Sequence, residues 1–222
     1  MNISKIIRED FEINGEVSKI FKSISYNSKD IKKGDLFVAI KGLNNDGHDF
    51  IDEAIKKGAS AIVFEKTHYK PINNKNVTWI GVDDSRDALA WIASRFYDNP
   101  SKDIHLIGIT GTNGKTSTTY MVESIAKVAG LSPGVIGTIE YRWKGRRETS
   151  PNTTPESRDL QELIFHMKHD GVNCIIMEVS SHALELSRAD DVHFDVVAFT
   201  NLTRDHLDFH GNFEKYFEAK KK

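Results

Sequence analysis

The sequence predicts an α/β fold, in which a small N-terminal α/β domain precedes a domain built on a parallel sheet. Short apolar runs alternate along the chain with segments whose apolar residues recur at helical spacing. Gly58, Gly130 and Gly171 follow helical segments, and glycine ends helices because it tolerates a left-handed backbone. A glycine-rich turn, residues 110–114, joins an apolar run directly to a helical segment. Strands that alternate with helices in this way are typical of parallel sheets.

The first 98 residues are expected to form the N-terminal domain. Its expected strands are Leu36–Ile40, Ala61–Phe64 and Thr78–Val82. One helix is expected near residues 50–57 and a second at Ser85–Tyr97, each with apolar residues on one face. Asn99-Pro100 ends the second helix, because proline disfavours helical backbone in the residue before it. We therefore place the boundary near residues 98–102, and residues 99–222 form the second domain.

The second domain is expected to contain buried strands whose carboxyl ends carry polar residues. These strands are Ile104–Ile109, Val135–Ile139, Cys174–Met177 and Val196–Phe199. The helix Thr116–Ala129 has Met121, Ile125 and Val128 on one face. Another helix is expected to begin at Thr154-Pro155 and to turn Leu160, Leu163, Ile164 and Met167 inward. Ligands of parallel sheets bind beyond the carboxyl ends of the strands.

Composition excludes several classes of protein. With 39% hydrophobic and 28% charged residues, the chain is neither disordered nor fibrous. Its net charge of −2 gives no basic footprint for nucleic acid. No apolar stretch approaches the roughly 18 residues of a membrane span, and charges interrupt the N-terminus too soon for a signal peptide. We expect a cytoplasmic protein without membrane insertion.

Cys174 is the only cysteine, so no internal disulfide forms and a reducing cytoplasm fits. It lies within an apolar run that ends at Met177. Free cysteine behaves as a small hydrophobic residue. We therefore expect a buried structural thiol rather than a nucleophile.

The segment Ile109–Ser117 carries the most specific chemical signal. Its sequence Thr-Gly-Thr-Asn-Gly-Lys-Thr-Ser follows an apolar strand and opens a helix. Glycines let backbone amides turn towards phosphates, and a helix N-terminus adds unpaired N–H groups. Lys115 is expected to meet the β- and γ-phosphates, and the Thr116 hydroxyl to contact Mg²⁺. The pattern departs from the strict phosphate-loop motif at Ile109, where that motif has glycine, and the alternative is a plain glycine-rich turn.

Polar residues follow two further strands and open one helix. Glu178 ends the strand Cys174–Met177, where a carboxylate can reach a metal held by the loop, and the alternative is an exposed strand-end residue. The segment Phe199–Asp208 concentrates Asn, Arg, Asp and His, which have either a structural or a ligand role. Asn152-Thr153-Thr154-Pro155 reads as a capped helix start or a ligand loop. These features indicate an ATP- or GTP-dependent phosphoryl-transfer enzyme, with the acceptor unspecified.

Together these motifs resemble the Mur ligase family. They are Thr-Gly-Thr-Asn-Gly-Lys-Thr, Asn-Thr-Thr-Pro, Met-Glu-Val-Ser-Ser-His-Ala-Leu and Phe-Thr-Asn-Leu-Thr-Arg-Asp-His-Leu-Asp-Phe-His-Gly, with Ser28–Gly42 and Asp46–Phe50 nearer the N-terminus. The resemblance spans nearly the whole chain. It is strongest to the family members that add the third amino acid, L-lysine or meso-diaminopimelate, to UDP-N-acetylmuramoyl-L-alanyl-D-glutamate.

The resemblance implies an N-terminal UDP-sugar-binding domain, a central ATPase domain and a C-terminal amino-acid-binding domain. It also implies that ATP phosphorylates the D-glutamate carboxylate and that the amine of the diamino acid attacks the acyl phosphate. The chain ends at Lys222, inside the expected central domain. We therefore expect a truncated protein that is inactive as a ligase by itself. A monomer is expected.

The resemblance also assigns roles to individual residues. The expected catalytic residues are Lys115, Glu178 and His206. The residues expected to hold ATP are Gly111, Thr112, Asn113, Gly114, Lys115, Thr116 and Ser117. Mg²⁺ ions are expected at Thr116, Glu178, His206 and Lys220, the last as a carbamate. The residues expected to bind the UDP-muramoyl-dipeptide are Ser28, Asn152, Thr153, Thr154, Ser180 and Arg188.

Three alternatives remain open from the sequence. Another Mur ligase or a folylpolyglutamate synthetase shares the phosphate loop, but Ser28–Gly42 suggests a UDP-sugar site that folate ligases lack. A nucleotide- or UDP-sugar-binding module without turnover is the alternative outside enzymes. For Lys220, a solvated lysine in a frayed terminal Lys-Lys-Lys run competes with the carbamate.

Overall fold

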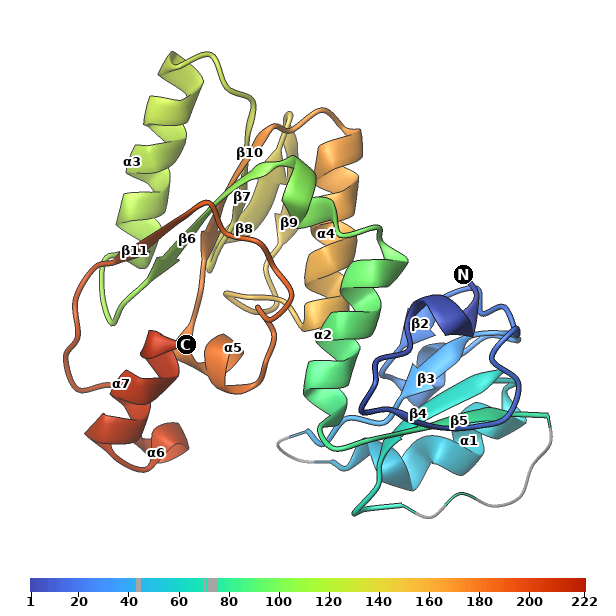
Figure 1. Ribbon diagram of the computed structural model, residues 1–222. Coiled ribbons are helices and arrows are strands. Elements are labelled where there is room, and N and C mark those ends of the chain that lie inside the picture. Colours follow the sequence, from blue (N-terminus) through green and yellow to red (C-terminus); the bar gives the residue numbers. More distant parts are fainter. Residues whose placement is uncertain (43–44, 70, 72–75) are drawn as a thin grey trace. The chain divides into compact units, whose positions relative to one another are not determined.

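The computed structural model describes residues 1–42, 45–69, 71 and 76–222 (Figure 1). It divides into two compact units, Met1–Phe96 and Tyr97–Lys222. None of the described helices is both long and apolar enough to cross a membrane.

The first unit is a five-stranded sheet with the order β1-β5-β4-β3-β2. Its strands are β1 (Glu12–Asn14), β2 (Ile24–Ser25), β3 (Leu36–Val38), β4 (Ala61–Glu65) and β5 (Thr78–Val82). Its helices are η1 (Ile3–Lys5), η2 (Ser28–Asp30), η3 (Gly47–Phe50), α1 (Ile51–Lys56) and α2 (Ser85–Phe96). The strands β2 to β5 pair in parallel, and β1 joins β5 antiparallel.

Alternate residues of these strands face two apolar clusters, because successive strand side chains point to opposite faces. Leu36 and Val38 pack with Leu89 and Ile92 of α2. Phe37 packs with residues of α1 in the other cluster. The two helices therefore cover opposite faces of the sheet, and the α/β architecture expected for this part of the chain is confirmed.

The second unit contains a six-stranded sheet with the order β11-β6-β10-β7-β8-β9. Its strands are β6 (His105–Thr110), β7 (Pro133–Ile136), β8 (Glu140–Trp143), β9 (Arg146–Thr149), β10 (Cys174–Glu178) and β11 (Val196–Phe199). Its helices are η4 (Pro100–Asp103), α3 (Lys115–Val128), α4 (Ser157–His169), α5 (Ser181–Glu185), α6 (Leu207–His210) and α7 (Phe213–Lys221). The strands β11, β6, β10 and β7 are parallel, as the sequence predicted.

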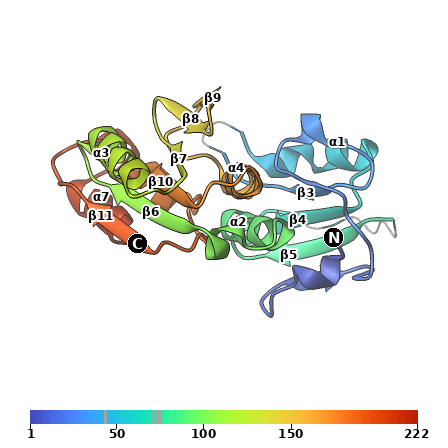
Figure 2. The ribbon, with the colours of Figure 1, turned by 90° about the horizontal axis from the view of Figure 1, so that it is seen from above.

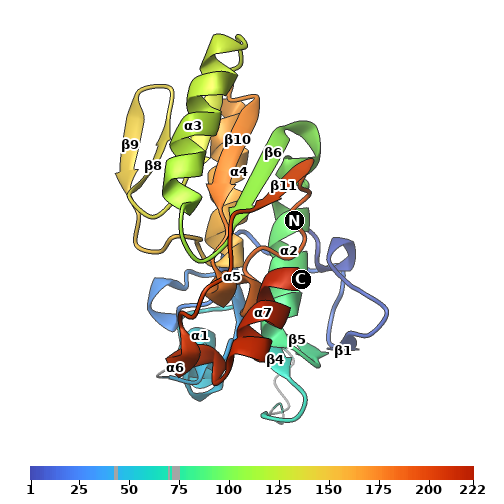
Figure 3. The same cartoon turned by 90° about the vertical axis from the view of Figure 1, so that its left-hand side faces the viewer.

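Helices α3 and α4 lie on opposite faces of this sheet (Figures 1 and 3). Ile175 and Met177 of β10 pack with the inner face of α4, and the four apolar residues predicted for that face are buried. Cys174 and Ile176 face α3 instead. Cys174 is 1% exposed, as expected for a structural thiol, and burial raises its pKa.

The prediction of a buried strand at Val196–Phe199 was wrong, and the apolar face of α3 is exposed too. Met121, Ile125 and Val128 of α3 are 65%, 67% and 88% exposed, and the helix instead buries Thr119, Glu123 and Ala126. The strand β11 is largely exposed as well, with Val197 at 75%. Apolar spacing identifies a helix or strand but does not say whether its apolar face has a partner. In the described structure β11 is an edge strand that pairs with β6.

The hairpin β8–β9 was not anticipated, and it continues the sheet antiparallel beyond β7 (Figure 2). All residues of β9 are exposed, so the strand lacks the apolar alternation that identifies half-buried strands. Lys144 and Gly145 at the turn have φ angles of 45° and 80°. Two consecutive positive φ angles are typical of a tight hairpin turn whose twist matches the strands.

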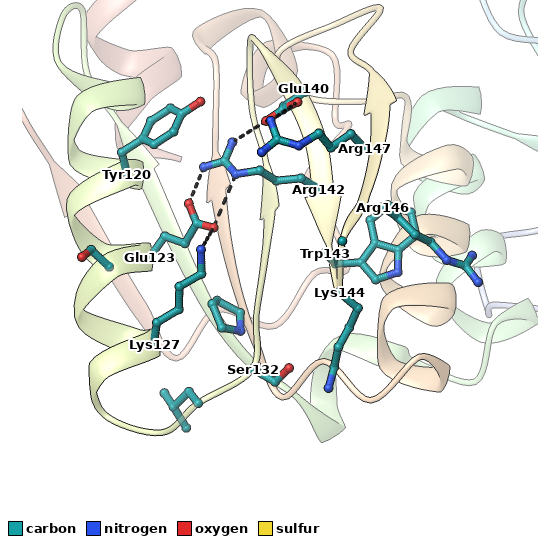
Figure 4. Close-up of a pocket in the computed structure, with 14 residues that line it drawn as sticks. Tyr120, Glu123, Lys127, Ser132, Glu140, Arg142, Trp143, Lys144, Arg146 and Arg147 are labelled. Atoms are coloured by element: carbon teal, nitrogen blue, oxygen red, sulfur yellow. Dashed lines mark hydrogen bonds and ion pairs between the residues drawn. The ribbon is translucent and has the colours of Figure 1, made fainter.

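A buried ion pair fastens this hairpin to α3. Arg142 of β8 is hydrogen-bonded to Glu123 of α3, and the two residues are 9% and 8% exposed. Lys127 lies 2.8 Å from the same carboxylate, and Figure 4 shows Glu123 between the two cations, in the wall of a pocket of about 660 Å³. Burial alone would raise the pKa of Glu123, but these two cations lower it below its ordinary value.

We predict that Glu123→Met lowers the free energy of unfolding by about 3 kcal/mol, because it removes the nearer carboxylate of the buried Arg142 guanidinium and leaves only Glu140, 3.5 Å away. The double variant Glu123→Met/Arg142→Met should be more stable than the single one, since no buried guanidinium then remains without its nearer carboxylate. Urea unfolding measures both, and the exposed Glu148→Met serves as a control. Equal stabilities for the single and double variants would show that the pair does not anchor the hairpin.

Candidate nucleotide and metal site

Three neighbouring parallel strands end at one edge of the second sheet. Glu178 of β10 lies opposite Ile109 of β6, and Phe199 of β11 lies opposite Thr110. The glycine-rich loop, the Glu178 carboxylate and the segment after Phe199 therefore lie at the same edge. This is the edge at which ligands of parallel sheets bind.

The glycine-rich loop, residues 110–114, depends on glycine at two positions. Gly111 has a φ of 142°, and a Cβ added there would lie 1.9 Å from Thr200 Oγ1. Gly114 has a φ of 85° and precedes α3 without any side-chain cap. No N-cap side chain therefore accepts a hydrogen bond from the first backbone N–H groups of this 14-residue helix, which lie at the site. Such an uncapped N-terminus favours an anion by its N–H groups and its dipole.

The segment after β11 holds the glycine-rich loop in shape. The Thr112 amide donates to Asn201 O at 2.9 Å, and the Asn113 amide donates to Asn201 Oδ1 at 3.0 Å. The Thr200 hydroxyl donates to Asn113 O at 2.7 Å. The loop is therefore fixed before any ligand binds, and the uncapped amides at the start of α3 are the ones available to a phosphate.

Lys115 lies over this loop. Its Nζ donates to Gly111 O at 2.9 Å and to Thr112 O at 3.0 Å. Burial lowers the pKa of its amine, and the negative charges of Glu178 and Asp205 oppose that shift. A phosphate oxygen is a stronger partner for an ammonium group than a neutral carbonyl oxygen is. The lysine is thus placed to exchange loop carbonyls for a phosphate.

Glu178 is 1% exposed and accepts three hydrogen bonds. Thr116 donates its hydroxyl hydrogen to Oε2 at 3.0 Å. Thr138, in the turn between β7 and β8, donates its amide hydrogen to Oε1 at 3.1 Å and its hydroxyl hydrogen to Oε2 at 3.1 Å. The alternative of an exposed strand-end glutamate is therefore wrong. A buried carboxylate needs such partners.

Lys220 is buried rather than solvated. It lies within α7 at 6% exposure, and its Nζ donates to Gly111 O at 3.0 Å. The expectation of a frayed terminal lysine is wrong, because α7 contacts α5 and carries Lys220 against the loop. Its pKa is lowered to about 8, mainly by burial and also by the charge of Lys115, while the charge of Asp205 opposes this shift.

Tyr216 links α7 to the same loop. Its side chain is fully buried, and its hydroxyl lies 2.8 Å from Thr112 Oγ1. The Thr203 amide donates to that threonine oxygen at 3.0 Å. The glycine-rich loop, the segment after β11 and the helix that carries Lys220 therefore share one hydrogen-bonded network.

His206 belongs to a cluster of aromatic rings beside this network. Its ring centroid lies 4.7 Å from that of His182 and 6.4 Å from that of Tyr216, and its Nε2 lies 3.4 Å from Asp205 Oδ2. Its backbone has a φ of 50°, a left-handed conformation that costs energy for a non-glycine residue and is frequent at functional sites. Burial lowers the pKa of the neighbouring His182.

The residues of the predicted substrate loop gather beside Glu178. The Thr153 hydroxyl lies 3.0 Å from the Thr138 hydroxyl. Thr154 does not cap α4, which begins at Ser157 with Glu156 as its N-cap. Its buried hydroxyl instead donates to Glu178 O at 2.9 Å. The helix start predicted at Thr154-Pro155 was therefore wrong by a few residues.

The remaining predicted residues divide between the two units. Asn152 is exposed and accepts through its backbone O from Tyr141 at 2.6 Å. Ser180 caps α5 through the Ala183 amide. Arg188 forms an ion pair through Nε, which lies 3.3 Å from Glu156 Oε2, and another of its N–H groups donates to Thr154 O at 3.5 Å. Ser28 lies in the first unit, where its hydroxyl donates to Glu53 at 2.9 Å.

The oxygen donors present at Glu178 fit Mg²⁺. Magnesium prefers oxygen and is usually held by one or two carboxylates together with phosphate oxygens and water. The Glu178 carboxylate and the Thr116 hydroxyl are adjacent. No group of three or more His, Cys, Asp or Glu side chains suited to a metal occurs among the described residues. A carboxylate and a hydroxyl beside the uncapped start of α3 suit a metal that phosphate oxygens also bind.

Sequence reasoning missed Gly137, Thr138 and Tyr216. A Cβ at Gly137 would lie 2.4 Å from Glu178 Oε1, so glycine is needed there for close approach. The sequence Gly-Thr after an apolar strand is the signal that could have marked this turn as a third strand-end loop. Tyr216 gave no such signal, because its partner Thr112 lies 104 residues earlier.

Comparison with known proteins identifies two family regions. The family model for the Mur ligase middle domain matches residues 109–222, and that for the Mur ligase catalytic domain matches residues 20–97. The UDP-N-acetylmuramoyl-L-alanyl-D-glutamate–2,6-diaminopimelate ligase of Geobacter sulfurreducens is 45% identical over 94% of this chain. The chain spans 40% of the length of that relative.

Solved structures agree with this result. A UDP-N-acetylmuramoyl-L-alanyl-D-glutamate–2,6-diaminopimelate ligase matches 99% of this chain with a TM-score of 0.81 and 26% identity, over 44% of its own length. A MurF ligase from Thermotoga maritima in complex with ADP matches 90% of this chain, over 42% of its own length, with a TM-score of 0.59 and 27% identity. With its phosphate loop and strand-end carboxylate in one site, the chain belongs to the Mur ligase family.

Proposed function

We propose that this chain forms the UDP-sugar-binding and ATP-binding parts of a ligase that adds 2,6-diaminopimelate to UDP-N-acetylmuramoyl-L-alanyl-D-glutamate. The observation that carries the proposal is the Glu178 carboxylate beside the Thr116 hydroxyl at the start of a phosphate loop. The relative named above is a ligase of this kind, at 45% identity. We further propose that the protein acts in the cytoplasm.

The chain's own residues support the binding and activation of a carboxylate. The uncapped amides at the start of α3 and the Lys115 ammonium would hold the phosphates. ATP would supply the phosphoryl group that activates the D-glutamate carboxylate for attack by an amine, and Mg²⁺ would neutralise the charge of its phosphates. Because a phosphoryl group in transfer spreads negative charge over its oxygens, positioning and charge neutralisation provide most of the catalysis.

The substrate-binding residues are assigned from the resemblance of the sequence, and the contacts of several of them support the assignment. Thr153 and Thr154 contact the groups around Glu178, so a substrate held there lies beside the nucleotide site. Arg188 is held beside Thr154 by its ion pair with Glu156, and a guanidinium suits a carboxylate or phosphate. We assign Asn152, Ser180 and Ser28 to the same substrate. His206 is proposed as a ligand of a second Mg²⁺ together with Glu178.

Calorimetry tests the proposed substrate. We expect UDP-N-acetylmuramoyl-L-alanyl-D-glutamate to bind this chain more tightly than UDP-N-acetylmuramoyl-L-alanine. Arg188→Ala should weaken binding of the dipeptide form by about tenfold or more, the size expected for a lost charge-assisted hydrogen bond. Arg146→Ala, which removes a 62% exposed arginine, is the matched control. If the dipeptide form and UDP-N-acetylmuramoyl-L-alanine bind with equal affinity to a chain that circular dichroism shows to be folded, the assignment is contradicted.

We propose that Lys220 forms a carbamate with CO₂ and thereby becomes an oxygen ligand for the second Mg²⁺. The neutral amine forms the N–C bond and releases a proton to solvent. Its pKa of about 8 lies below the ordinary value of 10.5, so the neutral form dominates above pH 8. At fixed bicarbonate, the carbamate should therefore rise as pH increases from 7 to 9 and then level off.

Carbon-13 NMR in labelled bicarbonate measures this carbamate. The signal should be absent in Lys220→Met and retained in Lys222→Met, which removes an exposed lysine of the same terminal run. A carbamate signal that rises only near pH 10.5, or that survives in Lys220→Met, would contradict the assignment.

A further inference from the structure

The turn between β7 and β8 approaches the Glu178 carboxylate closely. Gly137 leaves room for Oε1, because a Cβ in its place would lie only 2.4 Å away. Thr138 follows and supplies two of the three hydrogen bonds that reach the carboxylate. The turn therefore contacts both oxygens of a group that we have proposed as a magnesium ligand.

The hydrogen positions in this contact follow from chemistry. An ionised carboxylate accepts hydrogen bonds and donates none, so Thr138 must give its only hydroxyl hydrogen to Oε2. Its oxygen can then only accept from the Thr153 hydroxyl, which lies 3.0 Å away. The three groups thus form a directed chain from Thr153 through Thr138 to Glu178. The chain joins the proposed substrate loop to the proposed metal ligand.

The turn is itself held in place. It leads into β8, and Arg142 of β8 forms the buried ion pair with Glu123 of α3. The same helix begins at the phosphate loop and carries Thr116, the other donor to Glu178. Thr116 and Thr138 therefore meet the carboxylate from two elements that are fastened to each other. Such a closed arrangement restricts the orientation of the carboxylate.

We infer that Thr138 is a positioning residue that orients the Glu178 carboxylate for Mg²⁺ and couples it to Thr153. The inference rests on the proposed function, because it takes Glu178 as a metal ligand. Groups that hydrogen-bond to metal ligands commonly change metal affinity by about 10- to 100-fold when they are removed. Thr138 is exposed, so its side chain can be changed with little effect on packing.

The first experiment measures the Mg²⁺ concentration needed for this chain to bind a non-hydrolysable ATP analogue. Thr138→Val keeps the shape and the backbone N–H but removes the hydroxyl, and should raise that concentration about tenfold. Thr138→Ser restores the hydroxyl and should behave like the unaltered chain. Thr149→Val, at an exposed position of β9, is the matched control. An unchanged Mg²⁺ requirement in Thr138→Val would overturn the inference.

A second experiment separates failure of this inference from failure of the proposed function. Thr138→Val, Glu178→Ala and the double variant are compared by urea unfolding, without metal or nucleotide. The two changes should be non-additive, because each removes the partner of the other. Additive effects would overturn the inference. If the unaltered chain binds no nucleotide, the proposed function fails, and the unfolding cycle still decides whether Thr138 holds Glu178.

Discussion

The buried carboxylate of Glu178 is the interaction on which the arrangement of the second unit depends. A charge at 1% exposure is costly unless hydrogen bonds replace its water. Here the donors are Thr116 at the start of α3 and Thr138 in the turn after β7. The hydrogen bonds to this one carboxylate therefore fix α3 and the β7–β8 turn relative to β10 at the centre of the sheet.

The opposite side of the glycine-rich loop is held by neutral hydrogen bonds. Asn201 bonds the backbone of Thr112 and Asn113, and Tyr216 bonds the Thr112 hydroxyl. These contacts shape the loop without using the amides at the start of α3. Lys220 reaches the loop from the same side as Tyr216, since both lie on α7. The groups that shape the loop are therefore different from the N–H groups at the start of α3 that can bind a ligand.

Much of this could be predicted from sequence because the signals were local. The strands β5 and β11 have the predicted bounds, and the phosphate loop lies between strand and helix as expected. Burial was harder to predict, since the apolar face of α3 is exposed at Val128 and the polar Glu123 is buried. That inversion depends on Arg142 of β8, in a hairpin that was not predicted. The role of Thr138 also depends on a partner distant in the chain.

The central claim is that the Glu178 edge of the sheet holds a magnesium nucleotide. The most direct measurement is a crystal structure of this chain with Mn²⁺ in place of Mg²⁺ and a non-hydrolysable ATP analogue, with the metal located by anomalous scattering. The account predicts a metal bound to oxygens of Glu178 and Thr116, with phosphates against the first turn of α3. A nucleotide bound elsewhere, or a metal without Glu178 as a ligand, would contradict it.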